Sequence, residues 1–406
     1  MATSGNFVQL HNHTHYSLLD GASKIPDLVK RAKELNMPAV GITDHGNMHG
    51  AYEMWSTAVK EGVKPIIGIE AYVTPETARQ DQTRVSWDTN WNPDIDPQHR
   101  RRNPNDVSGG GLITHLTMWA ETDEGLVNLM KASTDANLEG RVMRYPRMDK
   151  EILAKYSKGI IASSGCPSGI IQTRLLLGQF DEALRAAGEL QDIFGRDNFY
   201  IEFMDHGLKI EKQVTDGLLD IAKKLNAPLL ATNDSHYVRA EDAGSQDAML
   251  CINSGSTLDE PGRFKFDGTG YYLKSAEEMR ELFKDIPEAC DNTLEIAERC
   301  NVMFDDHEDG AFMPQFDCPE GWDETSLFLR KVEEGLEQRY DGHPPIEVLK
   351  QADYECGVIC QMQFCGYFLV VADYINWAKS HGVMVGPGRG SAAGAMVAYA
   401  MGITEL

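Results

Sequence analysis

Metal-binding side chains recur along the first 240 residues of the chain, nearly always directly after a short apolar run. They comprise five histidines, three carboxylates and one cysteine: His11, His13, Asp20, His45, Glu70, His115, Cys166, Asp234 and His236. Nine such residues are too many for one tetrahedral ion, and their mixture of nitrogen, oxygen and sulfur suits two or three divalent ions. Zinc is favoured where Cys166 binds, whereas manganese or iron is tolerated at the other positions.

A cluster of this kind is suited to the hydrolysis of phosphate esters. Bound divalent ions lower the pKa of a water molecule towards about 7 and hold the attacking and leaving oxygens of a phosphoryl displacement. The three carboxylates and a Cys166 thiolate bring about −4 of charge, which three divalent ions would convert to about +2. The loaded site is therefore expected to attract a phosphodiester, and the empty site to repel one.

The elements that must position these residues are short strands alternating with helices. Seven apolar runs, mostly without alternation, are typical of strands buried on both faces: residues 7–10, 39–42, 65–69, 111–113, 159–162, 199–203 and 228–231. Helical stripes lie between them, for example after Pro26 and from Leu184 behind an expected Asp181 cap. This pattern predicts an α/β fold, either a barrel or a doubly wound sheet. In α/β barrels, the loops after the strands build the active site.

Composition narrows the class of protein. The 406 residues include 38 Lys and Arg against 62 Asp and Glu, a net charge of −24, which argues against a general nucleic-acid coat. The eight cysteines contain no CxxC pair and so favour neither a disulfide framework nor a zinc ribbon; apart from Cys166, we expect them to be buried thiols. Neither a signal peptide nor a membrane-length apolar run is visible, so we expect a cytoplasmic protein with no membrane partner.

Two segments interrupt the pattern. Residues 79–110 are polar and aperiodic, and their Arg100–Arg102 cluster suits either a phosphate contact or a mobile surface insertion. A capping box at Ser275–Glu278 opens a more helical region. We therefore expect a phosphoesterase domain over residues 1–280 and a second domain over residues 281–406, which looks cut at its end.

The motifs around the nine residues resemble those of the polymerase-and-histidinol-phosphatase (PHP) domain, and more narrowly its form at the N-terminus of the bacterial replicative DNA polymerase III alpha subunits (C-family polymerases). The motifs are residues 11–13, 43–47, 68–72, 165–169 and 233–237. This resemblance implies a distorted, TIM-like (β/α)7 barrel with a trinuclear site whose ligands are all nine side chains. It further implies a 3′–5′ exonuclease that proofreads the 3′ end of a DNA primer-template.

A glycine-rich loop lies near the end of the sequence, at residues 386–394. Its residues match the loose dinucleotide pattern GxGxxA, but a tight strand-to-helix turn explains them equally well. The loop also resembles the start of the α+β, nucleotidyltransferase-like palm of the same polymerases, which implies that Arg389, Gly390 and Ser391 hold a nucleotide triphosphate. The magnesium-binding aspartates come later in that family, so we expect polymerisation only in a full-length protein, with a sliding clamp, clamp loader and other replisome subunits as partners.

Alternatives remain open at this point. The metals of a non-catalytic PHP scaffold would stabilise a surface that docks a separate proofreading subunit, and a small-molecule phosphatase would share the same metal chemistry. His15 is interpreted as a loop histidine, Asp44 as an orienter of a ligand, and His206 as either structural or pocket-lining. Aromatic residues at 367–377 are expected in a core rather than in a base-stacking platform.

Overall fold

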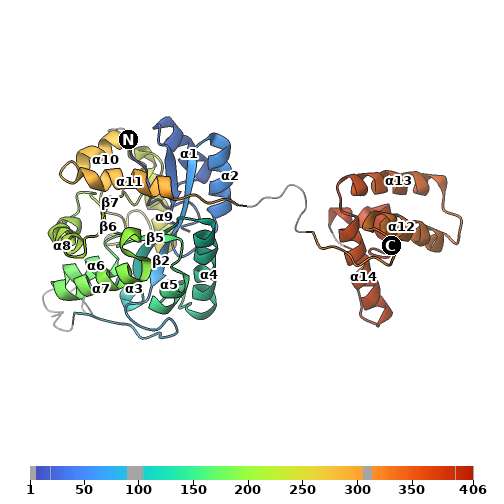
Figure 1. Cartoon of the computed structure of the whole chain (residues 1–406), viewed down its shortest axis with the longest axis horizontal. Helices are drawn as coiled ribbons and strands as arrows, with labels where there is room; N and C mark the ends of the chain where they lie inside the picture. The colour runs from blue at the N-terminus through green and yellow to red at the C-terminus, as the bar shows by residue number, and fades with distance from the viewer. Residues whose placement is uncertain are drawn as a thin grey trace. The chain divides into compact units, whose positions relative to one another are not determined.

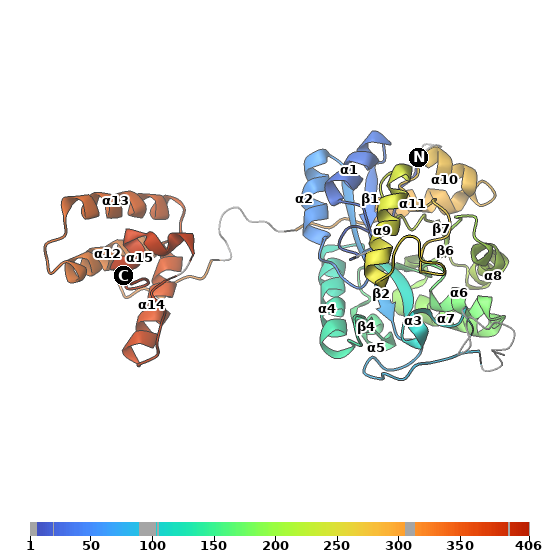
Figure 2. The same cartoon turned by 180° about the vertical axis from the view of Figure 1, so that it is seen from behind.

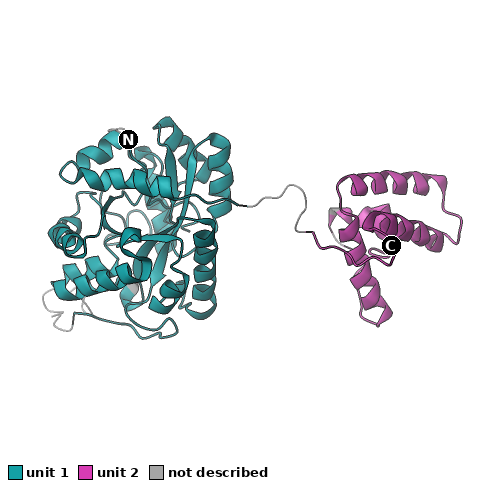
Figure 3. Ribbon diagram, viewed as in Figure 1, with its two compact units in different colours: residues 1–304 teal, residues 305–406 magenta. Residues whose placement is uncertain are grey.

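The computed structural model describes residues 6–18, 20–88, 103, 105–304, 313–388 and 390–405. Two compact units make up the chain, residues 1–304 and residues 305–406 (Figure 3). The first unit extends beyond the expected boundary at residue 280 because helix α11 (Pro287–Arg299) packs onto the barrel. The Val8 amide donates to Thr293 Oγ1 at 3.1 Å, and Asn292 donates to the Leu229 carbonyl at 2.7 Å.

A curled sheet forms the centre of the first unit (Figure 1). Its strands pair in the order β1 (Ala39–Ile42), β2 (Lys64–Val73), β3 (Thr114–Ala120), β5 (Ile160–Ser163), β6 (Phe199–Phe203) and β7 (Leu229–Ala231), while β4 (Arg147–Met148) pairs with β2 off this path. Residues 7–14 close the ring, because Gln9 bridges Val40 of β1 and Asn12 bridges Ser235 after β7. The distorted barrel is thus confirmed, although residues 7–10 form a single isolated bridge, at Gln9, instead of a regular strand.

Strand β3 differs from its predicted position and direction. The sequence suggested a strand at residues 111–113 that ends before His115, whereas β3 begins at Thr114 and runs antiparallel to both β2 and β5. The glycines before it, Gly110 and Gly111, have positive φ and belong to a short helix, α3 (Ser108–Gly111). Since β3 is reversed, its first residues lie at the same rim as the last residues of β2, and His115 pairs with Tyr72.

Helices cover the outer face of the sheet, and the largest core cluster lies between the two layers. They are α1 (Ile25–Glu34), α2 (Ala51–Glu61), α4 (Asp123–Glu139), α5 (Lys150–Tyr156), α6 (Ile170–Leu176), α7 (Phe180–Phe194) and α8 (Lys209–Leu225), followed by α9 (Ala243–Ser254) and α10 (Ala276–Leu282). The predicted capping box at Ser275 is confirmed, since its side chain accepts from the Glu278 amide. The predicted Asp181 cap is wrong: Gln179 is the N-cap, and Asp181 lies in the first turn of α7.

The described part of the second unit is helical. Helices α12 (Glu324–Arg339), α13 (Ile346–Gln361), α14 (Cys365–Ser380) and α15 (Met396–Ala400) surround a small core that contains Phe328, Leu369 and Val397. The predicted strand before the glycine loop is absent from described residues 383–386, and Met384 is 98% exposed. Gly390 precedes a short 3-10 helix, η4 (Ser391–Gly394), whereas Arg389 lies outside the described residues.

Three of the four aromatic residues of α14 contradict their predicted burial, whereas Phe368 packs against Phe328 in the core, as predicted. Tyr367, Tyr374 and Trp377 are about half exposed, because α14 buries only a narrow stripe that includes Leu369 and Ala372. No single helix of the described residues has the length and hydropathy to cross a membrane. Helices α13 and α14 pass that criterion only as a pair, by length and composition, with a 114° bend between them.

Candidate metal centre

All nine predicted residues lie close together at one rim of the barrel. Figure 2 shows this unit from the side of α9. The closing segment carries His11 and His13, and the loop after it carries Asp20. His45 and Cys166 follow strands β1 and β5, while Glu70 and His115 lie within β2 and β3. Two further residues, Asp234 and His236, follow β7. Segments far apart in sequence thus bring nine ligand-type side chains to one place.

Glu70 is the centre of the arrangement and is only 1% exposed. Its Oε1 lies 3.1 Å from His115 Nδ1 and 3.6 Å from His11 Nε2. Its Oε2 lies 2.6 Å from His45 Nδ1 and 3.5 Å from His13 Nε2. One buried carboxylate therefore faces four imidazoles, a position from which both of its oxygens would be available to hold divalent cations.

The remaining residues complete the cluster around this carboxylate. Asp234 Oδ1 lies 3.1 Å from His13 Nε2, and Asp20 Oδ2 lies 3.0 Å from His45 Nε2. Cys166 Sγ lies 3.4 Å from His115 Nδ1, and the ring of His236 stacks on that of His13 with 4.3 Å between centroids. Every one of the nine side chains thus contacts at least one other member.

Unpartnered polar atoms show that this cluster fits divalent cations. Several buried atoms form no hydrogen bond, although some approach one another as closely as the 2.6 Å between His45 Nδ1 and Glu70 Oε2. They are His11 Nε2, His13 Nε2, Asp20 Oδ1, His45 Nδ1, both oxygens of Glu70, Asp234 Oδ1 and His236 Nε2. Burying such atoms without partners costs free energy, and native proteins rarely leave them so. Three overlapping groups of nitrogen and oxygen ligands each lie within 4.8 Å, among them His11, His13 and Glu70. Nitrogen, oxygen and sulfur ligands at these separations suit zinc, manganese or iron.

Electrostatics favours the metal-binding protonation state at His13, Glu70 and Asp234. Burial, together with repulsion from His45 and His236, lowers the pKa of His13 to about 3, so its imidazole is neutral. Burial opposes the charged form of Glu70, but the surrounding imidazoles outweigh it and hold its pKa well below the usual value. Asp234 behaves in the same way, with its pKa lowered by its histidine neighbours. Neutral imidazoles and ionised carboxylates are the metal-binding forms.

At His11, by contrast, burial opposes the charged form, but Glu202 and Asp234 outweigh it and raise the pKa to about 9. At His45 the carboxylates of Asp20 and Glu70 likewise outweigh burial and raise the pKa well above its usual value. Burial raises the pKa of the Cys166 thiol.

Two sequence families match separate parts of the chain. Residues 9–206 match the PHP domain, and residues 326–406 match the bacterial DNA polymerase III alpha NTPase domain. Over all 406 residues the chain is 51% identical to the DNA polymerase III subunit alpha of Mycobacterium tuberculosis. The chain belongs to the DNA polymerase III alpha family. A subunit from Mycobacterium leprae is likewise 51% identical over 99% of the chain, and the chain spans 33% of the length of each of these two relatives.

The PHP match of this alpha-family chain contains seven of the nine cluster residues, and Asp234 and His236 follow its end. Among solved structures, an amidohydrolase from Chromobacterium violaceum with bound sulfate and no metal is similar at 15% identity and a TM-score of 0.34. That similarity covers 57% of this chain and 88% of the amidohydrolase. It is too distant to bear on function.

Sequence reasoning missed Glu202, which lies in β6 and is 1% exposed. His11 Nδ1 donates to Glu202 Oε1 at 2.8 Å, Thr232 Oγ1 donates to the same oxygen at 2.5 Å, and Ser163 donates to Oε2. Glu202 therefore turns His11 so that its Nε2 lone pair faces the cluster, as carboxylates beyond metal-binding histidines do. The available signal was an acidic residue inside an apolar strand, where an unpaired charge is not tolerated.

Ser17 orients the ring of His13, as Glu202 orients that of His11. His13 Nδ1 donates to Ser17 Oγ at 2.9 Å, and Ser17 in turn donates to Asp44 at 2.8 Å. Asp44 thus orients a histidine, as expected, but acts through Ser17 instead of directly.

His206 is structural, because its two ring nitrogens contact Glu211 Oε1 and the Asn233 carbonyl. The ring of His15 lies 4.3 Å from that of Tyr16 at a tilt of 36°, and His15 belongs to none of the candidate metal groups among the described residues.

Replacing Glu202 with glutamine is expected to weaken binding of Zn²⁺ by the alpha-family chain about 10- to 100-fold, the usual cost of losing a carboxylate that orients a metal-binding histidine. Calorimetric titration of the metal-free protein measures this. Glu211→Gln is the matched control, since Glu211 is also buried and also contacts a histidine, His206, outside the cluster. Equal affinities in the two variants would show that Glu202 has no role in the site.

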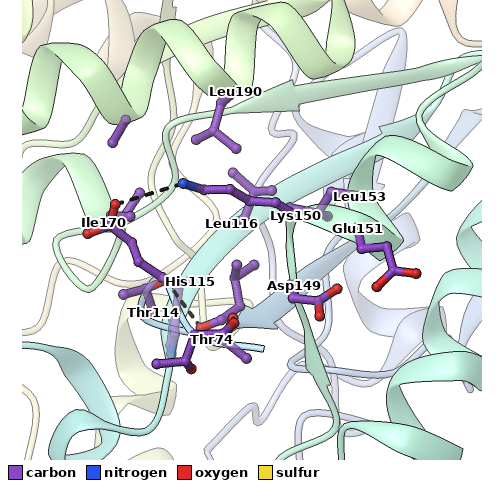
Figure 4. A pocket seen from close by; sticks show the side chains of 14 residues that line it. Thr74, Thr114, His115, Leu116, Asp149, Lys150, Glu151, Leu153, Ile170 and Leu190 are labelled. Atoms are coloured by element: carbon purple, nitrogen blue, oxygen red, sulfur yellow. Dashed lines mark hydrogen bonds and ion pairs between the residues drawn. The ribbon is translucent and has the colours of Figure 1, made fainter. Parts of the chain in front are cut away.

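A cavity of about 210 Å³ shares His115 with the cluster (Figure 4). Aliphatic side chains form much of its lining, and its charged residues are paired with neighbours: Lys150 with Glu189, Glu76 with Arg174, and both Asp149 and Glu151 with Arg79. With no unpaired charge to receive a phosphate, this cavity does not extend the reaction site.

Proposed function

We propose that the first unit hydrolyses DNA phosphodiesters from the 3′ end, using two or three divalent ions held by the nine cluster residues. The observation that carries this proposal is the set of buried, unpartnered nitrogen and oxygen atoms that face one another around Glu70. Membership of the DNA polymerase III alpha family supports DNA as the substrate class, because an exonuclease beside a polymerase can remove misincorporated nucleotides.

The cluster residues differ in how deeply they are buried, and we assign their roles accordingly. His11, His13 and Glu70 are buried and fix the base of the cluster. Asp20, His45, His115 and Asp234 are 13–19% exposed and form what we call the open side, where a phosphate can enter. When bound, divalent ions supply an activated water and stabilise the departing 3′ oxygen. With the carboxylate of Glu202 behind His11 included, the four carboxylates and the Cys166 thiolate carry about −5 of charge. Three divalent ions would therefore bring the net charge of the site to about +1.

We further propose that the glycine loop of the second unit binds a nucleotide triphosphate in a longer polymerase. The match of residues 326–406 to the polymerase NTPase domain supports this role for Arg389, Gly390 and Ser391. Polymerisation would require magnesium and aspartates from beyond this chain. For the whole protein, the proposed partners are a DNA primer-template, a sliding clamp, a clamp loader and other replisome subunits.

Digestion of a labelled primer tests the hydrolytic proposal. The purified chain with Mn²⁺ or Zn²⁺ is expected to shorten a mismatched primer from its 3′ end, and His13→Ala is expected to stop shortening because a buried ligand is lost. Equal shortening by both proteins would assign the activity to a contaminant. No shortening, combined with metal-dependent stability, would favour a scaffold that docks a separate nuclease, and turnover of a phosphomonoester alone would favour a small-molecule phosphatase.

A further inference from the structure

Helix α9 and the loop after it border the open side of the cluster. Gln246 of α9 donates to the Asp20 carbonyl at 3.1 Å, which ties the helix to the loop that carries a proposed ligand. Near the other end of α9, Asn253 accepts from Arg144 at 2.8 Å. Residues 255–272 then return along the rim to Tyr271, whose carbonyl accepts from the His236 amide at 2.7 Å. This loop therefore lies directly beside the cluster, next to His236.

Two phenylalanines of the loop form an aromatic surface beside the cluster. The ring of Phe266 meets that of His236 edge-to-face, with 4.7 Å between centroids, and lies 4.8 Å from the ring of Tyr271. Phe264 lies 6.1 Å from Phe266 at 85° and is 59% exposed. Phe266 thus seats the pair against a proposed metal ligand, while Phe264 presents aromatic surface to solvent.

The loop is held by polar contacts that leave these rings in place. Arg263 donates to both carboxylate oxygens of Asp247 at 2.6 Å, and its Nε donates to the Leu258 carbonyl at 3.2 Å. Such a bidentate pair fixes the backbone immediately before Phe264. Lys265, between the two phenylalanines, is exposed. An aromatic pair with a cation between its members resembles the combination used to bind single-stranded nucleic acids.

We propose that Phe264, which Phe266 holds in place from the side, stacks the terminal nucleobase of an unpaired DNA 3′ end while the cluster holds its phosphodiester, an inference that rests on the proposed exonuclease function. Stacking tolerates any base, because every base has an aromatic face. It requires that face to be free, which favours a frayed or mismatched end over a paired one. Lys265 and Arg144 supply positive charge for the backbone in a chain with a net charge of −24.

Binding to a fluorescent oligonucleotide tests the stacking without any hydrolysis. The probe is single-stranded DNA with 2-aminopurine as its 3′ base and a phosphorothioate at the last linkage, which resists cleavage. We expect the whole chain to quench the fluorescence and Phe264→Leu to weaken binding about tenfold. Leu258→Ala is the control, since this exposed loop residue carries no ring and its carbonyl contact to Arg263 is retained. Equal binding by all three proteins would overturn the proposal.

Cleavage of an oligonucleotide with an abasic 3′ end distinguishes a failure of the proposed stacking from a failure of the proposed hydrolysis. The measured quantity is the ratio of kcat/KM for an oligonucleotide with a 3′ adenine to that for one with an abasic 3′ residue. Phe264→Leu is expected to lower this ratio about tenfold, and Leu258→Ala to leave it unchanged. An unchanged ratio in Phe264→Leu with both substrates cleaved would overturn the stacking alone. Cleavage of neither substrate by the unsubstituted chain would defeat the proposed hydrolysis, while the fluorescence measurement would still decide whether the base stacks.

Discussion

Substituting Glu70 with glutamine is expected to lower metal-dependent hydrolysis of a DNA 3′ end by roughly a thousandfold or more. Glu70 faces His11, His45 and His115 among its four imidazole neighbours, and both of its oxygens lack hydrogen-bond partners. Glutamine keeps the volume but removes the charge and one acceptor oxygen, so it would hold divalent cations far more weakly. Single-turnover digestion of a labelled single strand at saturating Mn²⁺ measures the loss.

The control for this substitution is Glu53→Gln on helix α2. Glu53 accepts from the Tyr16 hydroxyl at 2.7 Å and contributes no atom to the cluster, so its loss tests for general damage to the barrel. Activity in Glu70→Gln within tenfold of that in Glu53→Gln would contradict the role of Glu70 as a metal ligand. Equal loss in both variants, with unchanged melting temperatures, would mean that the reaction occurs elsewhere.

Withdrawal of the metal is expected to lower the melting temperature of the first unit by roughly 5–15 °C. A ligand at about 1,000 times its Kd contributes about 4 kcal/mol per site to the free energy of unfolding, and a large domain gains about 2–4 °C for each kcal/mol. Without cations, the buried carboxylates of Glu70 and Asp234 face imidazoles, among them that of His13. Differential scanning calorimetry before and after treatment with a chelator measures the shift.

The second unit provides an internal comparison for that experiment. All three candidate metal groups found among the described residues lie in the first unit, so only the first transition is expected to move. Adding Zn²⁺ or Mn²⁺ back is expected to return the melting temperature of the first unit to its original value. A melting profile that does not respond to the chelator, or that shifts equally in the Glu70→Gln variant, would indicate that the cluster does not contribute to stability through bound ions.

The convergence of the cluster was predictable because strand ends are marked in the sequence. A short apolar run followed by His, Asp or Glu identifies the end of a buried strand, and a closed α/β sheet brings these ends to one rim. His45 after β1 and Asp234 after β7 follow this rule. His115 reached the same rim for a different reason, because β3 is reversed and begins there. Strand direction depends on pairing between distant segments, which one strand's residues do not encode.

Residues that orient the candidate metal ligands were harder to predict from the sequence than the ligands themselves. Glu202 lies in an apolar strand and contacts His11 across 191 positions of sequence, so its role appears only when β6 and the closing segment are adjacent. Asp44 was recognised as an orienter, but its route through Ser17 depends on a turn after His13. The exposed aromatics of α14 were misjudged because the expected burial assumed a broad apolar face, whereas the helix packs a narrow stripe.

Elemental analysis of the purified chain tests the central claim most directly. We predict two or three zinc, manganese or iron atoms per chain after exhaustive dialysis against metal-free buffer, and a lower content in the His13→Ala variant. One tightly bound ion or none, with no gain when metals are added back, would contradict the assignment of these nine side chains to a multinuclear centre.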